Sequence, residues 1–341
     1  MRTILADLRK GLLSGRLAAG SRLPSVRDLA ETYGVAGTTV HRCLQELTAA
    51  GFLSTHGRNG TRVVDHPPHR CRFGLVLPEL PGADGTYVTR HWQAKAVAAR
   101  AISTTPAQQV ELFHGINGHP ELPEHQALLQ ALDEQRLAGL IVVDEDRIRD
   151  WLVPARQRVP VVGVNVVAGK PAIGQLFLDQ ADFLNYALEA VAKRGLRRVA
   201  VCLDVNGVSQ AATLQARAKA LNLDLPLQRI LCLPVTAVEW APHVIASCFS
   251  GPVQDHPEAL ILGDEIGIPA VGAALNSRNI GPVFQVHIAN LPLPALSKRP
   301  ALRLGWDNRA YLLQAMALIT AWHEHRQPIG NGSLPLIEAS A

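Results

Sequence analysis

Residues 20–63 contain the pattern that most constrains how this chain can fold. Two amphipathic helices are expected on either side of a short turn at Val35–Thr38, and two short strands around an Asn-Gly turn follow them. Ser25 is expected to cap the first of these helices, and Gly34 to end it. The order of helix, turn, helix and hairpin is that of a winged helix-turn-helix.

A further helix is expected before this motif, over residues 2–14, because apolar residues recur there at helical spacing. In the second helix of the motif, Val40, Leu44 and Leu47 are expected to face inward. The other faces of that helix then carry the polar residues Thr38, Thr39, His41, Arg42 and Gln45. The strands of the hairpin are expected at Phe52–Thr55 and Thr61–Val64.

This arrangement predicts contact with double-stranded DNA, because a recognition helix fits the major groove and presents its first turns to base edges. His41 and Arg42 are the candidates for base contacts. Phosphate contacts, which fix register without reading sequence, are expected from a second set of residues: Arg27, Thr38, Thr39, Arg58 and Arg62. The alternatives are a module that binds only proteins and, for Arg42, a solvated surface charge.

The charge distribution favours a polyanion partner for this segment. Residues 1–70 contain ten Lys or Arg and five Asp or Glu, a net charge of +5. The whole chain carries +4, so the remaining residues carry −1. A basic small domain joined to a nearly neutral large one suits nucleic-acid binding through the small domain.

The segment resembles the DNA-binding domain of the GntR family of bacterial transcription regulators. The matching pieces are SGRLAAGSRLPSVRDLAETYGVAGTTV, LTAAGFL and GRNGTRVV. The resemblance implies operator contacts by position from Arg27, Thr38, Thr39, His41 and the wing around Arg58 and Asn59. In one place the chain departs from the family, because Ala36-Gly37 stands where Ser-Arg or Thr-Arg is usual. A cap hydroxyl and a DNA-contacting arginine are therefore missing.

Three parts are expected along the chain. A winged helix-turn-helix domain covers residues 1–64 (the head), a linker covers residues 65–71, and an effector domain covers residues 72–341 (the sensor). The adjacent prolines of the linker, Pro67 and Pro68, favour an extended and semi-rigid connector.

The sensor shows a repeated β-then-α pattern, which predicts an α/β fold. Several of the expected strands are continuous apolar runs, as parallel strands buried on both faces are. Strands are expected at Phe73–Leu77, Val110–Phe113, Gly139–Val143, Val159–Val164, Arg198–Leu203, Ala259–Leu262 and Val283–Val286. Helices are expected at Glu124–Gln135, Ala181–Lys193, Ala211–Leu221, Ile266–Ser277 and Asn308–His325. The pattern fits one doubly wound domain or two lobes.

A second resemblance favours two lobes. Residues 72–325 are similar to the periplasmic-binding-protein-like sensor of LacI-family regulators, in pieces such as AGLIVVDEDRIRDWLVPARQRVPVVGVNV and HPEALILGDEIGIPAVGAALNSRNI. A GntR-type head on such a sensor is the arrangement of arabinose-repressor-type proteins. The expected fold class is therefore α/β, with a winged helix-turn-helix (α+β) followed by a two-lobed sensor with parallel sheets.

In that fold the effector lies between the lobes at strand ends, where open α/β sheets bind their ligands. Carried over by position, Asn165, Asp264 and Asn290 line this cleft, with Tyr87 and Trp92 as a stacking surface. The alternative is that these residues only cap helices or satisfy loops. Sugar-binding members often carry an arginine where this chain has Gln210–Thr213, so another small polar effector, or none, also fits.

The remaining composition predicts a cytoplasmic regulator without a cofactor. Five scattered cysteines without a Cys-x-x-Cys pair favour reduced thiols, and we expect neither a signal peptide nor a membrane span. Phosphate-loop, dinucleotide and nucleophile-elbow motifs are missing. The two imidazoles of His323-Glu324-His325 diverge on a helix, which argues against a metal site. An aminotransferase-like domain would need a lysine for its Schiff base, and none of the lysines of the sensor stands in a sequence setting that suggests this role.

The resulting prediction is a ligand-responsive repressor that binds a roughly palindromic operator as a homodimer, with a small polar effector such as a sugar. Two alternatives remain. One is a DNA-binding protein whose sensor only dimerises, and the other is an α/β enzyme with a regulatory head.

Overall fold

The structure is a computed structural model of the whole chain, and it describes residues 2–55, 57, 60–82, 89–117, 119–143, 155, 158–164, 174–177, 180–234, 236–325, 330 and 332–339. The chain forms two compact units. The first unit comprises Met1–Gly85, Ala98–Leu176 and Leu312–Gly332, and the second comprises Thr86–Val97, Phe177–Tyr311 and Ser333–Ala341.

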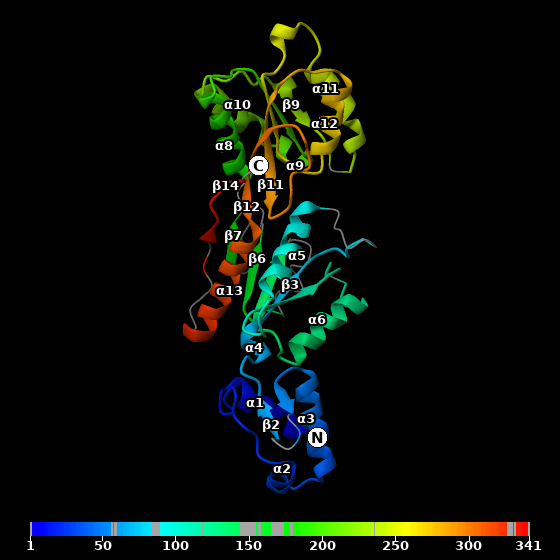
Figure 1. Cartoon of the computed structure of the whole chain (residues 1–341), viewed down its shortest axis with the longest axis vertical. Helices are drawn as coiled ribbons and strands as arrows, with labels where there is room; N and C mark the ends of the chain where they lie inside the picture. Colours follow the sequence, from blue (N-terminus) through cyan, green and yellow to red (C-terminus); the bar gives the residue numbers. More distant parts are fainter. Residues whose placement is uncertain are drawn as a thin grey trace. The chain divides into compact units, whose positions relative to one another are not determined.

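The head has the predicted order of elements (Figure 1). Its helices are α1 (Arg2–Leu13), α2 (Val26–Tyr33) and α3 (Gly37–Ala49), and the antiparallel strands β1 (Leu53–Thr55) and β2 (Thr61–Val63) form the wing. One apolar core joins them, because each contributes at least one fully buried side chain: Leu8, Leu29, Leu47, Leu53 and Val63.

The ends of α2 are capped as the sequence predicts. The Ser25 hydroxyl accepts a hydrogen bond from the Asp28 N–H at 3.2 Å, and the Asp28 carboxylate accepts one from the Ser25 N–H at 3.1 Å. This reciprocal pair is a capping box. Gly34 ends the helix with a φ of 61°, a left-handed conformation that glycine adopts without a steric penalty. The following helix begins at Gly37, so the turn is shorter than the expected Val35–Thr38.

The expectation that the adjacent prolines favour an extended linker is wrong for Pro68–Cys71. Pro68–Cys71 form one turn of helix, α4, and the Arg70 N–H donates to the Pro67 carbonyl at 3.0 Å. The physical reason is that proline is well suited to the first position of a helix, where its missing N–H would have no partner. Pro67 has the extended conformation that the residue before a proline favours.

The first of two six-stranded sheets among the described residues has the strand order β13-β7-β6-β5-β3-β4. The neighbours from β7 to β4 are parallel. Its strands are β3 (Arg72–Val76), β4 (Gln109–Phe113), β5 (Gly139–Val143), β6 (Val161–Val164), β7 (Gly174–Phe177) and β13 (Gly332–Ser333). The helices α5 (Arg90–Ile102) and α6 (Pro123–Asp133) connect β3 to β4 and β4 to β5.

The second sheet has the order β14-β12-β11-β10-β8-β9 and is parallel except for β14 at its edge. Its strands are β8 (Val199–Leu203), β9 (Ile230–Cys232), β10 (Ala259–Leu262), β11 (Phe284–Leu291), β12 (Ala301–Asp307) and β14 (Ile337–Ala339). The helices of this half are α8 (Gln180–Lys193), α9 (Val205–Val208), α10 (Ala211–Ala220), α11 (Ala241–Cys248) and α12 (Ile268–Ser277). Helix α13 (Asn308–His325) starts in the second unit and belongs to the first unit from Leu312 onward.

Helices cover both faces of the second sheet, with α8 and α10 on one side and α11 and α12 on the other (Figure 1). Alternate residues of β8 point to opposite faces. Ala200 and Cys202 pack with α11 and α12, while Val199 and Val201 belong to the other face and are fully buried as well. The prediction of parallel strands buried on both faces is confirmed, and so is the α/β class with two sheets rather than one.

Candidate DNA interface and candidate effector site

The polar residues of α3 lie where the sequence predicts. Val40, Cys43, Leu44 and Leu47 are buried in the core of the head. Because positions three and four apart share one side of a helix, the exposed residues Thr38, His41 and Arg42 form a single face, with Thr39 half-buried beside it. Exposed polar side chains on one face of a rigid helix are suited to enter a groove of DNA.

Arg27 lies in the first turn of α2 and is exposed. The capping box directly before it fixes the direction in which α2 starts. The cation therefore stands on a fixed helix end, which suits a contact that sets register on the phosphate backbone.

The wing contributes Arg62, which is exposed on β2 and donates from Nη1 to the Gly20 carbonyl at 3.1 Å. Arg22 forms an isolated bridge with Arg62 and is also exposed. Arg22 could not be selected from the sequence, because its nearness to the wing depends on the path of the chain before α2. Arg58 and Asn59 lie outside the residues that the structure describes.

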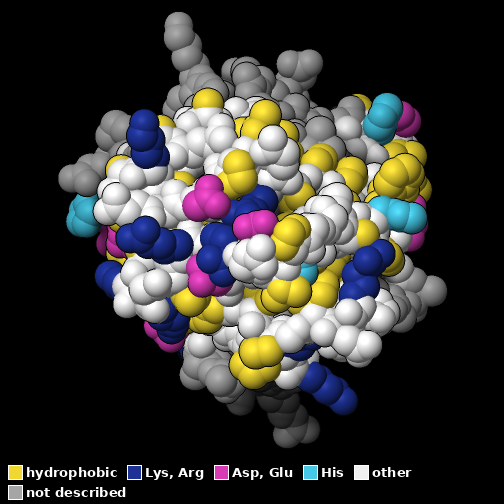
Figure 2. All heavy atoms as spheres, turned by 90° about the horizontal axis from the view of Figure 1, so that it is seen from above, with side chains coloured by type: hydrophobic (Ala, Val, Ile, Leu, Met, Phe, Trp, Pro, Cys, Tyr) yellow, Lys and Arg dark blue, Asp and Glu magenta, His cyan; other side chains and the backbone are white. Residues whose placement is uncertain are grey.

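The face drawn in Figure 2 differs from the basic head in its charge, because Lys and Arg side chains stand beside Asp and Glu side chains there. Hydrophobic side chains are dispersed among them. A surface of mixed sign does not attract a polyanion as a one-signed surface does. The basic head remains the better candidate for the DNA interface.

The candidate effector site belongs to the second unit, at the carboxyl edge of its parallel sheet. Asp204 directly follows β8, Asp264 and Glu265 follow β10, Asn290 is near the end of β11, and Asp307 ends β12. The register of these parallel strands brings all their carboxyl ends to the same edge. Polar groups from four strands therefore gather at this edge, where α/β folds bind their ligands.

Asp264 accepts a hydrogen bond on Oδ1 from the Ile266 N–H at 2.7 Å. Burial raises the pKa of its carboxyl group, with smaller contributions from the nearby charges of Asp204 and Glu265. A carboxylate in such surroundings gains from a hydrogen-bond donor supplied by a ligand.

Asn290 is already paired inside the protein. Its Nδ2 donates to Glu265 Oε2 at 2.9 Å, and its Oδ1 lies 3.3 Å from His91 Nδ1. Of the other predicted residues, Trp92 is buried, with 6% of its surface exposed, and Tyr87 and Asn165 lie outside the described residues.

The same network continues into the first turns of α5. Arg90 donates from Nε to Glu265 Oε2 at 3.2 Å and from Nη2 to the Pro294 carbonyl at 2.6 Å. The Glu265 side chain is almost completely buried, so this ion pair is shielded from water. All of its members belong to the second unit.

Lys95 lies at the end of this network and is fully buried. Its Nζ donates to Asn308 Oδ1 at 3.0 Å and lies 2.8 Å from His91 Nε2. Burial lowers the pKa of Lys95 well below its ordinary value, and burial together with Lys95 lowers that of His91. Both groups can therefore be neutral, which removes the cost of two adjacent buried cations.

Five members of the network escaped the sequence analysis: Arg90, His91, Lys95, Glu265 and Asn308. A helix at Arg90–Ile102 was not expected, so nothing suggested that its first turn meets β10 and β11. Glu265 alone had a usable signal, because it directly follows Asp264 at a strand end.

The described part of the chain contains no group of three or more His, Cys, Asp or Glu side chains suited to hold a metal ion. Helices long and apolar enough to cross a membrane are likewise not found among those residues.

The fold and the two sites define a class of protein. The chain carries a GntR-type helix-turn-helix domain at its N-terminus and a sensor with the fold of LacI-family regulators. Residues 1–63 match the family described as "Bacterial regulatory proteins, gntR family".

Particular relatives are transcription regulators by name. The chain is 44% identical over 82 residues to the HTH-type transcriptional regulator Rv1152 of Mycobacterium tuberculosis, a match that covers 24% of this chain and 65% of the relative. It is 24% identical over 166 residues to the arabinose metabolism transcriptional repressor of Halalkalibacterium halodurans, a match that covers 47% of this chain and 44% of the relative. The chain thus spans less than two thirds of either relative.

For the fold, a regulatory protein of the LacI family from Chloroflexus aggregans superposes with a TM-score of 0.62. The match covers 78% of this chain and 96% of that structure, at 14% identity. The likeness at this identity concerns the fold alone.

Proposed function

We propose that this protein is a transcriptional repressor that binds operator DNA through the head and responds to a small polar effector in the sensor. The observation that carries the proposal is the exposed face of Thr38, His41 and Arg42 on α3, with Arg27 beside it on α2. The match of residues 1–63 to GntR regulators supports it. Such a protein acts in the cytoplasm, where operator DNA lies, and as a regulator rather than an enzyme.

The roles in DNA binding divide by chemistry. His41 and Arg42 read base edges, while Arg27, Thr38, Thr39 and the wing residues Arg58, Asn59 and Arg62 contact the backbone. We expect a homodimer on a two-fold operator, because the two-fold symmetry of operators mirrors that of the proteins that bind them.

The effector is proposed to bind at the carboxyl edge of the second sheet, with Asp264 and Asn290 as polar contacts and with Tyr87 and Trp92 as the stacking surface expected from the sequence. A carboxylate and an amide offer both acceptors and donors, which suits a ligand rich in hydroxyl groups. The name of the arabinose repressor relative makes sugars the first compounds to test. An effector changes operator affinity only by its unequal affinity for two forms of the protein.

A second candidate function is supported by one observation. Glu265 and Asn290 already satisfy each other, and Arg90 and His91 complete the network. A sensor with its polar groups paired in this way also fits a protein that dimerises and binds DNA without any effector.

The test is a selection of operator sites from random duplex DNA with the full chain at low ionic strength, followed by mobility-shift titrations. Enrichment of a two-fold motif, with affinity that falls as salt rises, is the expected result. Recovery of random sequences would contradict the assignment of the head.

The effector is tested separately, by adding sugars, nucleosides and other small polar compounds to the protein–operator complex. A compound that changes the operator affinity without being consumed supports the first candidate function. If compounds neither bind nor change the affinity, the second candidate holds, and turnover of a compound would point to an enzyme.

A further inference from the structure

A cavity of about 460 Å³ lies in the first unit beside the linker turn α4. It is lined by Leu13 of α1, His69 and Arg70 of α4, and Thr320, His323 and Glu324 of α13. Small-molecule sites commonly have about 300–1,000 Å³, so the size is that of a ligand site.

His69 is the unusual member of this lining. Its side chain is 8% exposed, and neither ring nitrogen has a hydrogen-bond partner among the described residues. Buried polar groups are almost always paired with protein, water or a ligand. The imidazole of this lining residue therefore has one donor and one acceptor that no described protein group satisfies.

The protonation state of His69 supports this assignment. Burial, with smaller contributions from Arg70 and His323, lowers its pKa to about 4. A neutral imidazole at pH 7 carries one N–H and one lone pair, which can pair with an acceptor and a donor of the same small molecule.

The position of the His69 ring is fixed by the head. It stacks on Phe52, with ring centroids 5.7 Å apart and an angle of 22° between the planes. His323, which also lines the cavity, donates from Nε2 to the Ala138 carbonyl at 2.6 Å, so its ring is held as well. The cavity is thus bordered by two oriented imidazoles.

The rim of the cavity carries one charge of each sign, because Arg70 and Glu324 are both exposed. An anion would be repelled by Glu324 and a cation by Arg70, whereas a zwitterion gains from both. Leu13 adds an apolar wall for a short side chain. We propose that this cavity, the linker cavity, binds a free α-amino acid, with its carboxylate toward Arg70, its ammonium group toward Glu324, and His69 between them.

This site goes beyond the effector site proposed above, since it shares no residue with Asp264, Asn290 or their network. Its occupant would contact α4, which is stacked on the core of the head, and α13 of the sensor. Binding there would stiffen the linker and would give the regulator a second input on operator affinity.

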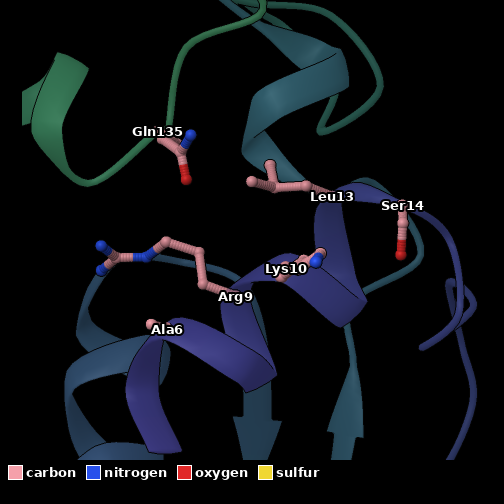
Figure 3. A pocket seen from close by; sticks show the side chains of 6 residues that line it. All are labelled: Ala6, Arg9, Lys10, Leu13, Ser14 and Gln135. Carbon is pink, nitrogen blue, oxygen red and sulfur yellow. The ribbon is translucent and has the colours of Figure 1, made fainter. Parts of the chain in front are cut away.

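A neighbouring pocket of about 440 Å³ shares Leu13 and is drawn in Figure 3. Arg9 and Gln135 lie on either side of it, and Lys10 and Ser14 complete its polar lining. The two cations there, with no carboxylate in the lining, suit a simple anion rather than a zwitterion. Lys10 therefore offers a matched control for nonspecific attraction of a carboxylate.

The test uses the full chain without DNA, in calorimetric titrations and thermal-shift scans with the common α-amino acids one at a time. Glucose and inorganic phosphate are the comparison ligands. We expect at least one amino acid to bind and to raise the melting temperature. Arg70→Gln and Glu324→Gln should each raise the Kd about tenfold or more, the usual size for a lost hydrogen bond to a charged group. Lys10→Gln should leave it unchanged.

Arg70 and Glu324 are exposed, so both variants should keep the fold, which circular dichroism checks. The inference is overturned if no amino acid binds, if phosphate or glucose binds here instead, or if both variants bind like the wild type. Loss of binding in Asn290→Ala alone would move the ligand to the effector site and would also overturn it. Since DNA is absent from the assay, a failure of the proposed DNA binding does not affect the result.

Discussion

Arg90 and Glu265, which are 175 residues apart in the sequence, form an ion pair with Nε and Oε2 3.2 Å apart. The carboxylate is 4% exposed and the guanidinium 19%. The pair attaches the first turn of α5 to the loop after β10, at the edge where the candidate effector residues lie.

Replacing Glu265 with Ala should lower the free energy of unfolding by about 3 kcal/mol, because removing one partner of a buried ion pair leaves the other uncompensated. Urea denaturation of the two proteins measures the difference. The matched control is Asp133→Asn, which breaks the exposed pair with Arg158 and should cost less than about 1 kcal/mol. Equal losses in both variants would mean that burial does not set the strength of the Glu265 pair.

Arg27→Gln should weaken operator binding and reduce the slope of log affinity against log salt by about one, since each neutralised phosphate contributes about 0.9 to that slope. Mobility shifts at several salt concentrations provide the measurement. Lys10→Gln removes another exposed cation of the head, but from α1, and should leave the slope unchanged. An Arg27→Gln variant with the wild-type slope would show that Arg27 contacts no phosphate.

Stability should fall as the pH drops below about 6.5, in part because of His287. Burial, and then the charge of Arg303, lower the pKa of His287 to about 4 from an ordinary value of 6.5. Between these values the unfolded chain binds a proton that the folded chain does not, so acid favours unfolding. The loss approaches about 1.4 kcal/mol per pH unit for each such group.

Denaturation curves at a series of pH values between 7 and about 4.5 would measure this dependence. His69, whose pKa is also lowered to about 4, should contribute in the same direction. His287→Gln should reduce the slope of the free energy of unfolding against pH by up to about 1.4 kcal/mol per pH unit, which is what the binding of one proton contributes. An unchanged slope in that variant would contradict a neutral His287 in the folded protein.

Gly305 of β12 allows no side chain. A Cβ atom there would overlap the carbonyl oxygen of Ala289 on the adjacent strand, far inside van der Waals contact and against rigid backbone. Gly305→Ala should therefore cost at least the 1–3 kcal/mol typical of overpacking, which thermal unfolding would detect. Gly281→Ala is the control, because its Cβ would have nothing within 4 Å, and it should melt like the wild type.

The elements that the sequence predicts correctly share a strong local signal. The Ser25 cap of α2 and the apolar runs of β5 and β10 depend on neighbours in the chain, and the structure has them at the expected positions. The helix over Arg90–Ile102 was missed because its apolar positions, mostly alanines, give little helical contrast. β9, with three residues, is too short for a periodic pattern.

The features of the candidate sites likewise divide into those that follow from a local sequence pattern and those that do not. Exposure of Arg27, His41 and Arg42 follows from helical periodicity, so the sequence was sufficient to expect it. The partners of Asn290 were not predictable, because Glu265 and His91 reach it from the loop after β10 and from α5 through the tertiary fold. Long-range pairing of this kind leaves no local pattern to read.

Helix α3 begins at Gly37, and Ala36 before it has no side chain to cap it. The Thr39 N–H donates to the Ala36 carbonyl at 3.0 Å, whereas the N–H groups of Gly37 and Thr38 have no capping side chain as an acceptor. A phosphate oxygen of bound DNA can fill that role, which makes ordering of this turn part of the association equilibrium. Amide hydrogens at the start of α3 should then exchange slowly in the complex and quickly in the free protein, so the duplex completes a piece of secondary structure that the polypeptide leaves unfinished.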